Sequence, residues 1–467
     1  MSRLTAVILA AGLGTRMKSA LPKVLHPIAG RPLLHYAVRA ALDAGVERAV
    51  VVTSGHPRID ELLASDFGER ACTVVQDPPR GTGDAARVGI EQVKTDRVLI
   101  LCGDTPLVRA EELARLVSAL EQPGADELSL MTCVLDSPRG YGRVLRDATG
   151  RVSEVREQRD LQSPEQHAVR EVNAGMYAGK TEVLRRALAR IQPNNAQGEY
   201  YLTDVIALLA GSSQVTGVAG HAEALLGVND RAQLAEAEEI MLRRIRFRHA
   251  QAGVTVRGTP RIDDSVEIGE DSLIEATVVL RGNTRIGTGT RIDAGCVVED
   301  STIGDGALLK PYTVVTSSNV GDGAQLGPFT HLRPNSEIEA EVHLGNFVET
   351  KNTRVRRGAK ANHLAYLGDG DIGERANVGA GTIFCNYDGF NKHRTVIGAD
   401  AFIGSDSQLV APITIGRGAY VASGTTVVTD VPDDALALGR TKQENKLGYA
   451  PKLKARFAAS KAAAKKA

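Results

Sequence analysis

The sequence predicts an α/β sheet domain followed by a parallel β-helix built from six-residue repeats. Up to about residue 229, short apolar runs alternate with stretches that have helical spacing. From about residue 252, aliphatic residues recur at every sixth position. The composition agrees with this division, because aromatic residues make up only 4% of the 467 residues and glycines number 48. A core of stacked aliphatic side chains with many tight turns would have this composition.

The first part of the chain contains apolar runs that predict buried strands, at residues 6–9, 50–52 and 98–101. Residues 33–42 and 111–120 have the spacing of amphipathic helices. Strands that alternate with helices indicate a mainly parallel sheet that is covered on both faces.

Four domains or segments follow from these patterns: residues 1–229, a linker helix at 230–251, the repeat domain at 252–436 and a tail at 437–467. In the linker, Leu234, Ala237, Met241 and Ile245 share one helical face. The tail is rich in Ala and Lys, which is typical of a frayed helix or a disordered end.

The repeat region has a period that neither a helix nor an alternating strand can produce. A hexapeptide β-helix does produce it, since one large aliphatic residue per side fills the narrow interior of a three-sided coil. The in-phase series are Ile262, Ile268, Ile274, Leu280, Ile286 and Ile292, then Val297, Ile303, Leu309 and Val315, then Val320, Leu326, Leu332, Ile338 and Leu344, and finally Ile397, Ile403, Leu409, Ile415, Val421 and Val427.

Two further expectations concern this coil. Glycine follows many of the aliphatic residues, as at Gly269 and Gly304, and we expect it to ease the turn at a corner. We also expect the repeat to be interrupted between Asn346 and Val396 by a polar cluster that carries a binding face.

Charge, hydropathy and cysteine content exclude several classes of protein. Lys+Arg and Asp+Glu both number 56, which argues against a whole-protein electrostatic grip on nucleic acid or membrane. No apolar run reaches the length of a membrane span, and no secretory signal is evident. Five widely spaced cysteines without a CxxC pair argue against disulfides or a zinc site and suggest a reducing cytoplasm.

A candidate phosphate site follows the first strand. Small residues at 10–12 let the backbone approach a ligand, and Arg16 and Lys23 add positive charge. Asp104 follows a later strand, at the edge where open α/β sheets bind ligands and where a carboxylate suits Mg²⁺. From the residues alone, Lys23 could equally be a solvated surface lysine and Asp104 a turn-forming residue.

These residues resemble a known family. The motif LAAGLGTRM followed by PKVLH, with GTGDA, CGD, GYGR, NNAQGEYY and GVN further along, is similar to sugar-1-phosphate nucleotidyltransferases. Together with the hexapeptide half, nearly the whole chain resembles the bacterial family of bifunctional N-acetylglucosamine-1-phosphate uridyltransferases and glucosamine-1-phosphate acetyltransferases. The resemblance implies a Rossmann-like α/β nucleotidyltransferase domain followed by a left-handed parallel β-helix, in a cytoplasmic homotrimer that makes cell-wall and lipopolysaccharide precursors.

The resemblance implies that Arg16 and Lys23 are catalytic in uridylyl transfer from UTP, and that Asp104 and Asn229 bind Mg²⁺. The implied binding site for UTP and UDP-N-acetylglucosamine comprises Leu9, Ala10, Ala11, Gly12, Lys23, Gln76, Gly81, Thr82, Cys102, Gly103, Asp104, Gly142, Glu157, Asn173 and Asn229. Cys102 departs from the family, in which an aromatic residue is common at this position.

For the second reaction, the resemblance implies that His363 is the general base for acetyl transfer from acetyl-CoA to glucosamine-1-phosphate. From the residues alone, a lone histidine is more often structural, and Glu349 could orient its ring if the coil stacks the two. The implied glucosamine-1-phosphate site comprises Arg333, Lys351, Tyr366 and Asn377, and the implied acetyl-CoA site comprises Ala380, Asn386, Tyr387, Ser405, Ser423 and Arg440. Arg333 and Lys351 could instead be solvated charges on the coil surface.

Two other functions are open from the sequence. One is a monofunctional sugar-1-phosphate nucleotidyltransferase whose β-helix serves only as a trimerisation scaffold. The other is a regulatory interaction protein without catalysis, which the presence of Arg16, Lys23, Asp104 and Asn229 disfavours.

Overall fold

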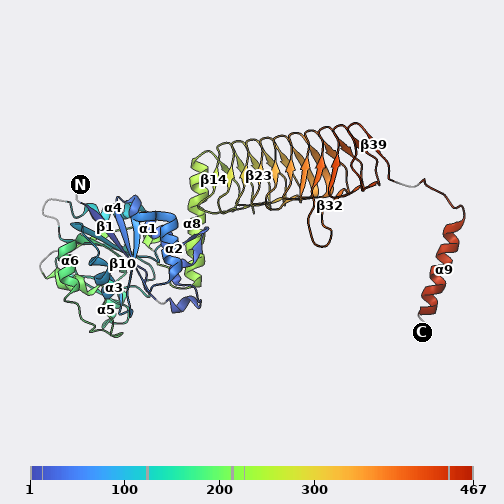
Figure 1. Cartoon of the computed structure of the whole chain (residues 1–467). Coiled ribbons are helices and arrows are strands. Elements are labelled where there is room, and N and C mark those ends of the chain that lie inside the picture. Colours follow the sequence, from blue (N-terminus) through green and yellow to red (C-terminus); the bar gives the residue numbers. More distant parts are fainter. Residues whose placement is uncertain are drawn as a thin grey trace. The chain divides into compact units, whose positions relative to one another are not determined.

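The computed structural model describes residues 3–12, 14–121, 126–211, 215–225, 227–439 and 442–464 (Figure 1). The chain forms two compact units. The first extends to Arg248 and includes Arg261–Ser265, and the second contains His249–Pro260 and the residues from Val266 onward. Among the described residues, no helix combines the length and the apolar character needed to cross a bilayer.

The first unit combines a mixed sheet with surrounding helices. Its strands are β1 (Leu4–Leu9), β2 (Pro27–Ile28), β3 (Arg31–Pro32), β4 (Arg48–Thr53), β5 (Ala71–Val75), β6 (Arg97–Cys102), β7 (Leu128–Val134), β8 (Arg143–Arg146), β9 (Val152–Arg156), β10 (Glu171–Lys180) and β11 (Val215–Ala219). Its helices are α1 (Leu33–Asp43), α2 (Pro57–Phe67), α3 (Thr82–Ile90), α4 (Ala110–Ser118), α5 (Pro164–Ala168), α6 (Thr181–Leu188), α7 (Asp204–Ala210) and α8 (Arg231–Gln251), with 3₁₀ turns η1 (Thr15–Met17), η2 (Lys23–Leu25), η3 (Gly68–Arg70) and η4 (Ala222–Leu225).

The main sheet has the strand order β11-β7-β10-β6-β1-β4-β5. β1 pairs in parallel with β4 and β6, and β11 pairs in parallel with β7. β10 is the exception, because it runs antiparallel to both β6 and β7. The predicted α/β class is therefore confirmed as a Rossmann-like sheet of mixed direction, with one reversed strand that the alternation of strands and helices did not reveal.

Helices cover both faces of this sheet, as predicted. The alternation along β1 sends Ala6 and Ile8 into a core with α1, α2 and α4, while Val7 and Leu9 enter a second core with α3, α6 and α7. The two cores hold the sheet rigid between them. Its carboxyl edge, where the parallel strands β1 and β6 both end, is left to the connecting loops.

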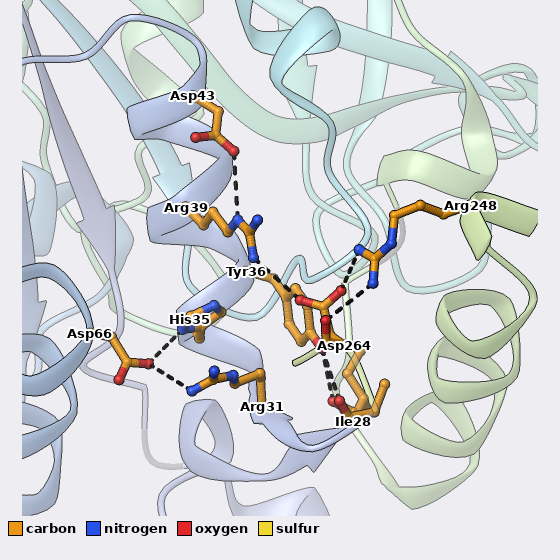
Figure 2. A network of polar contacts seen from close by, with 10 residues as sticks. Ile28, Arg31, His35, Tyr36, Arg39, Asp43, Asp66, Arg248 and Asp264 are labelled. Atoms are coloured by element: carbon orange, nitrogen blue, oxygen red, sulfur yellow. Dashed lines mark hydrogen bonds and ion pairs between the residues drawn. The ribbon is translucent and has the colours of Figure 1, made fainter. Parts of the chain in front are cut away.

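Helix α8, predicted as a linker, packs on the first unit through much of its length. Arg231 Nε donates to Met17 O at 3.3 Å, and Arg244 Nη1 donates to Leu107 O at 2.7 Å. Figure 2 shows Arg248 at its far end reaching Asp264, whose carboxylate also accepts from Arg39 of α1. The predicted segment boundaries at 229, 251 and 436 stay predictions.

The second unit is a coil of short parallel strands that ends in a separate helix, α9 (Tyr449–Ala464). The strands are β12 (Thr255–Val256), β13 (Arg261–Ile262, counted with the first unit), β14 (Glu267–Ile268), β15 (Leu273–Ile274), β16 (Val279–Arg281), β17 (Arg285–Ile286), β18 (Arg291–Ile292), β19 (Val297–Glu299), β20 (Thr302–Ile303), β21 (Leu308–Leu309), β22 (Val314–Thr316), β23 (Asn319–Val320), β24 (Gln325–Leu326), β25 (His331–Leu332), β26 (Glu337–Ile338), β27 (His343–Lys351), β28 (Arg354–Val355), β29 (Lys360–Gly368), β30 (Gly370–Ile372), β31 (Asn377–Val378), β32 (Ile383–Cys385), β33 (Thr395–Ile397), β34 (Phe402–Ile403), β35 (Gln408–Val410), β36 (Ile413–Ile415), β37 (Tyr420–Val421), β38 (Thr426–Val427) and β39 (Leu436–Ala437).

The predicted six-residue repeat is confirmed as a parallel β-helix, the architecture of a left-handed hexapeptide coil. Each aliphatic residue pairs with its counterpart one coil later, so that Ile268 aligns with Ile286, and Ile286 with Ile303. A second column pairs Leu309 with Leu326, and Leu326 with Leu344. Ile268, near the start of the coil, is half-buried, and the other side chains are buried and form a continuous stack along the coil interior.

Glycine follows the aliphatic residues for a different reason from the one expected. Gly269, Gly304 and Gly321 do not have the positive φ angles that favour glycine. Instead, the next coil passes too close for a side chain: a Cβ on Gly269 would lie 2.7 Å from Thr288 N, and one on Gly321 would lie 2.6 Å from Ala340 N. Close stacking of backbones therefore selects glycine here.

The repeat was expected to be interrupted over residues 346–396, but the interruption is much shorter. β27 and β29 continue the coil in register, pairing Asn346 with His363 and Glu349 with Tyr366. The interior positions here hold Thr350 and Ala361, which are small or polar and so escape a search for large aliphatic residues. Only the loop between β32 and β33 leaves the coil, and it is visible beside β32 in Figure 1.

Removing one stacked side chain tests this core. Leu326→Ala deletes a fully buried side chain between two neighbours of its column, and we expect it to destabilise the coil by about 2–5 kcal/mol. Val428→Ala, at a residue that is 67% exposed, is the matched control and should change stability by about 0.5 kcal/mol or less. Thermal unfolding of the full chain compares them, and equal midpoints for the two variants would contradict the stacked core.

Candidate active sites

A cavity of about 390 Å³ lies at the carboxyl edge of the main sheet. The parallel pairing of β1 with β6 aligns Leu9 with Cys102, and Gly103 N donates to Leu9 O at 2.9 Å. The two loops that follow these strands are therefore adjacent. The cavity is lined by Leu9, Ala10, Ala11, Gly12, Gly14, Thr15, Lys23, Val24, Gln76, Pro79, Gly81, Thr82, Ala85, Cys102, Asp104 and Glu199.

The turn that contains Gly12 and Gly14 follows β1 and packs against η2. Gly14 has a φ of +60°, and a Cβ there would lie 2.7 Å from the Cβ of Lys23. A larger residue would thus be strained and would displace Lys23. Nothing lies within 4 Å of the Cβ position of Gly12, so this part of the turn opens onto the cavity.

Lys23 connects the predicted catalytic residues. Its ammonium forms an ion pair with Asp104 and lies 3.4 Å from Asn229 Oδ1, which also accepts from Arg16 Nη2 at 2.9 Å. Asn229 is held close because Val228 N donates to Asp104 O at 2.8 Å. Two cationic side chains and two side-chain oxygen atoms from distant parts of the sequence therefore meet at one point.

The oxygen donors at this point fit a magnesium ion. Asp104 and Asn229 both direct a side-chain oxygen at the same ammonium group. Mg²⁺ typically takes one or two protein oxygens and completes its shell with phosphate oxygens and water. Within the described ranges, no group of three or more His, Cys, Asp or Glu side chains forms a larger metal cage.

Three residues of the implied nucleotide site, Gln76, Gly81 and Thr82, lie where β5 leads into α3. Gln76 is 3% exposed, and its Nε2 donates to Asp84 Oδ2 at 2.8 Å and to Gly81 O at 3.2 Å. A Cβ on Gly81 would lie 2.5 Å from Tyr200 O, so only glycine fits there. Thr82 Oγ1 accepts from Leu202 N at 3.1 Å, which joins the two segments.

Three further residues of the implied site, Gly142, Glu157 and Asn173, do not line this cavity but are close to one another. Asn173 N donates to Gly142 O at 2.9 Å, and a Cβ on Gly142 would lie 3.3 Å from Glu157 Oε1. Glu157 lines an adjacent hollow of about 430 Å³, where burial raises the pKa of its carboxyl above the ordinary value. Thr203 Oγ1 donates to this carboxyl at 3.3 Å and partly offsets the effect.

Cys102, the departure from the family pattern, faces the strand that carries Asn173. Its thiol donates to Gly175 O at 3.8 Å, and a Cβ on Gly175 would lie 3.3 Å from the sulfur. Burial, with the nearby Asp104 carboxylate, raises the pKa of the Cys102 thiol to about 12. The thiol is therefore a small neutral group in the cavity wall.

A cluster of cations lies on one side of the coil. Lys392, from the loop between β32 and β33, lowers the pKa of the Lys351 ammonium by direct side-chain contact and by repulsion, and Arg333 repels it further. Glu349 accepts from Arg333 Nη1 at 2.8 Å. The suggestion that Glu349 orients His363 is not supported, since the register stacks Glu349 on Tyr366 instead.

Tyr366 and Asn386 meet on the same side of the coil. A Cβ on Gly368 would lie 2.5 Å from the Tyr366 hydroxyl and 2.8 Å from Asn386 Nδ2. Asn386 is 5% exposed, and its Nδ2 donates to Asp369 Oδ2 at 2.6 Å. Gly368 therefore leaves room for the two predicted ligand-binding side chains to approach.

His363 occupies the neighbouring corner of the coil and is exposed. On the following coils, Gly381 N donates to Leu364 O, Asp406 N donates to Ala380 O, and Gly424 N donates to Ser405 O. These bonds align the predicted residues along one corner, in the order His363, Ala380, Ser405 and Ser423.

The three remaining predicted residues lie in different places. Tyr387 is 60% exposed and pairs with Lys392 across the loop. Asn377 lies in β31 on another side of the coil, between Lys360 and Phe402. Arg440 lies outside the described residues.

The structure adds four residues to which the sequence analysis gave no role. Asp84 holds Gln76, Asp369 holds Asn386, Glu199 lines the nucleotide cavity, and Lys392 joins the cation cluster. Asp84 and Glu199 lie within motifs noted above, and Asp369 and Lys392 lie in the polar segment 346–396, but the partners of all four are set by the fold. A sequence pattern alone gives no signal of these contacts.

Comparison with known proteins shows the family of the chain and the class of its two domains. Residues 6–169 match the MobA-like NTP transferase domain, and residues 265–300 and 394–429 match the bacterial transferase hexapeptide repeat. The "Bifunctional protein GlmU" of Sorangium cellulosum is 57% identical over 99% of this chain and 98% of its own length. The chain belongs to the GlmU family.

Other GlmU proteins match over a similar length. Those of Trichlorobacter lovleyi and Anaeromyxobacter dehalogenans are 46% and 49% identical, and the alignments cover 95% and 96% of this chain and 97% and 92% of theirs. The family predicted from the sequence is therefore confirmed, as is the assignment of the chain to the bifunctional transferase enzymes.

The raised pKa of Cys102 predicts low chemical reactivity. At pH 8, a thiol with a pKa of about 12 is almost entirely protonated, and thiolate is the form that reacts with iodoacetamide. Cys102 and Cys385 are both half-buried, so we expect the raised pKa of Cys102 to make its alkylation in the folded chain about tenfold or more slower than that of Cys385. Peptide mass spectrometry measures both, with urea-unfolded protein as the control. Equal labelling of the two thiols in the folded chain would contradict the raised pKa of Cys102.

Proposed function

We propose that the chain catalyses two consecutive transfers. Acetyl transfer from acetyl-CoA to glucosamine-1-phosphate gives N-acetylglucosamine-1-phosphate and CoA. Uridylyl transfer from UTP to that product then gives UDP-N-acetylglucosamine and pyrophosphate. We assign the second transfer to residues 1–229 and the first to residues 252–436, in a cytoplasmic enzyme that supplies precursors of peptidoglycan and lipopolysaccharide.

One observation carries most of this proposal. Ten of the residues predicted to bind the nucleotide line a single cavity, and the ion pair of Lys23 with Asp104 lies at its wall. These residues come from four separate loops of the sequence. Chance would not gather them, so their convergence supports nucleotidyl transfer at this edge.

For uridylyl transfer, a phosphate oxygen of the sugar phosphate attacks the α-phosphorus of UTP, and the bond to the pyrophosphate leaving group breaks. The nucleophile is already an anion, so positioning and charge neutralisation supply most of the catalysis. Lys23 and Arg16 bear the positive charge at this point. Their bonds to Asp104 and Asn229 hold both side chains before the substrate arrives.

Asp104 and Asn229 are the residues that would hold Mg²⁺. When bound, the ion supplies charge neutralisation for the phosphate oxygens and orients them. The contact of both oxygens with the Lys23 ammonium supports this assignment, because it marks a point that favours a cation.

For acetyl transfer, the amine of glucosamine-1-phosphate attacks the thioester carbonyl of acetyl-CoA. His363 accepts the proton that the amine loses and returns it to the departing sulfur, so that CoA leaves as its thiol. The alignment of Ala380, Ser405 and Ser423 along the corner of His363 supports an elongated acetyl-CoA site there.

The cation cluster supports binding of the sugar phosphate on this part of the coil. Arg333 and Lys392 repel Lys351, and the carboxylates of Glu349 and Asp369 offset only part of that charge. A phosphate dianion would relieve the repulsion and accept hydrogen bonds from all three groups. We therefore add Lys392 to the predicted phosphate-binding residues.

We also propose a homotrimer in which neighbouring coils complete the acetyl-transfer site. His363, Ser405 and Ser423 are exposed on a single chain. A reaction that excludes water from a thioester needs more cover than one coil corner gives. A second copy of the coil beside this corner would supply it.

Two variants should separate the reactions. Lys23→Met removes an ammonium from the nucleotide cavity, and we expect kcat/KM for uridylyl transfer to fall about 100-fold or more while acetyl transfer is retained. His363→Ala removes the base, and acetyl transfer should fall about 100-fold or more while uridylyl transfer is retained. Pyrophosphate and CoA release measure the two activities. Loss of both activities in either variant would argue against separate sites.

A third variant tests the phosphate-binding residues. Lys392→Met removes one cation from the cluster, so we expect KM for glucosamine-1-phosphate to rise about tenfold, with a small change in KM for acetyl-CoA. Lys360→Met, at an exposed lysine of β29, is the matched control and should leave both constants unchanged. An unchanged KM for the sugar phosphate in Lys392→Met would remove Lys392 from the site.

A further inference from the structure

The orientation of the Gln76 amide is set by two acceptors. The side-chain atom that lies 2.8 Å from Asp84 Oδ2 also lies 3.2 Å from Gly81 O. A carboxylate oxygen and a backbone carbonyl oxygen can only accept hydrogen bonds. This atom must therefore be the NH₂ nitrogen, and the reversed amide would place an oxygen against two oxygens.

The other end of the amide faces the ligand cavity. Gln76 lines the cavity while its backbone is fixed by donation to Thr53 O. Across the described ranges, no group donates to Gln76 Oε1. The cavity wall therefore presents a hydrogen-bond acceptor at this point. Asp84 Oδ2 and Gly81 O oppose the reversed orientation of the Gln76 amide.

Asp84 is itself held in place and charged. Arg87 Nη2 donates to Asp84 Oδ1 at 2.6 Å, and the Arg87 guanidinium lies 5.0 Å from the centre of the Tyr200 ring. Burial would raise the pKa of Asp84, but the hydrogen bonds from Gln76 and Arg87 outweigh it and lower the pKa below its ordinary value. Asp84 is thus a carboxylate at neutral pH and has no proton to donate to Gln76.

We infer that Asp84 is a positioning residue that sets base selectivity, by locking the Gln76 amide with its oxygen toward the pyrimidine. The inference rests on the proposed use of UTP in this cavity. Asp84 has not been assigned to the ligand contacts above, and it acts only through Gln76.

The chemistry of the two pyrimidines explains the selectivity. Uracil carries a hydrogen on N3, which can donate to an acceptor such as Gln76 Oε1. Cytosine has a lone pair on N3, which would oppose that oxygen. With Asp84 in place, the locked acceptor favours uracil, and a reversed amide would favour cytosine.

Asp84→Asn tests this lock with almost no change in shape. Its amide oxygen can accept from Arg87 while its NH₂ donates to Gln76 Oε1, so that Gly81 O alone still opposes reversal of the Gln76 amide. We expect kcat/KM for UTP to fall, kcat/KM for CTP to rise, and the ratio of the two to fall by about tenfold or more. Pyrophosphate release with N-acetylglucosamine-1-phosphate measures both nucleotides on the full chain.

Arg87→Lys is the matched control. It keeps a cation beside Asp84 and leaves the carboxylate as the acceptor for Gln76, so the UTP-to-CTP ratio should stay within about twofold of the parent value. Circular dichroism and the thermal unfolding midpoints of each variant report whether the first unit has folded, because acetyl transfer is assigned to the second unit.

Each outcome decides between the alternatives. A parallel loss of UTP and CTP turnover in Asp84→Asn, or an unchanged ratio, would overturn the inference and leave Asp84 with a structural role. If CTP turnover by the parent chain is too slow to measure, its appearance in Asp84→Asn supports the inference, and its continued absence counts against it. A parent chain that releases no pyrophosphate from UTP would instead refute the proposed function itself.

Discussion

In-register parallel pairing of strands is the constraint on which both candidate sites depend. In the first unit, the pairing of β1 with β6 ends both strands at one edge and sets the loop of Lys23 beside the loop of Asp104. In the second unit, the same kind of pairing stacks equivalent residues of successive coils at one corner. Residues far apart in the sequence meet in each unit because hydrogen bonding fixes the register.

Each candidate site brings cationic side chains together beside carboxylates. In the first unit, Lys23 and Arg16 share the oxygens of Asp104 and Asn229, and Glu199 also lines the cavity. On the coil, Glu349 pairs with Arg333, and Asp369 partly offsets the repulsion that Lys392 and Arg333 exert on Lys351. Clustered cations repel one another, and a bound phosphate group at either site would relieve that repulsion.

The sequence predicted the division of the chain because its two periodicities reflect two kinds of core. The motif around Lys23 and the carboxylate at Asp104 were predictable for a related reason, since small and charged residues directly follow buried strands. The reversed direction of β10 was not predictable, because an antiparallel strand in a covered sheet has the same apolar pattern as a parallel one.

Side-chain partners were the least predictable feature. Glu349 could have reached His363, yet the register gives it Arg333. Asp84 lies in a recognisable motif, but its effect on the orientation of Gln76 depends on the backbone of Gly81. The glycines of the coil were identified correctly and explained wrongly, since the neighbouring backbone that excludes a side chain belongs to the next coil.

The most direct test of the account is a time course of pyrophosphate release by the full chain with glucosamine-1-phosphate, UTP and Mg²⁺, in the presence and absence of acetyl-CoA. The account predicts release only with acetyl-CoA, after a lag during which the acetylated sugar phosphate accumulates. Immediate release at the same rate without acetyl-CoA would contradict it, because the chain would then use the unacetylated sugar directly and the two transfers would not be consecutive.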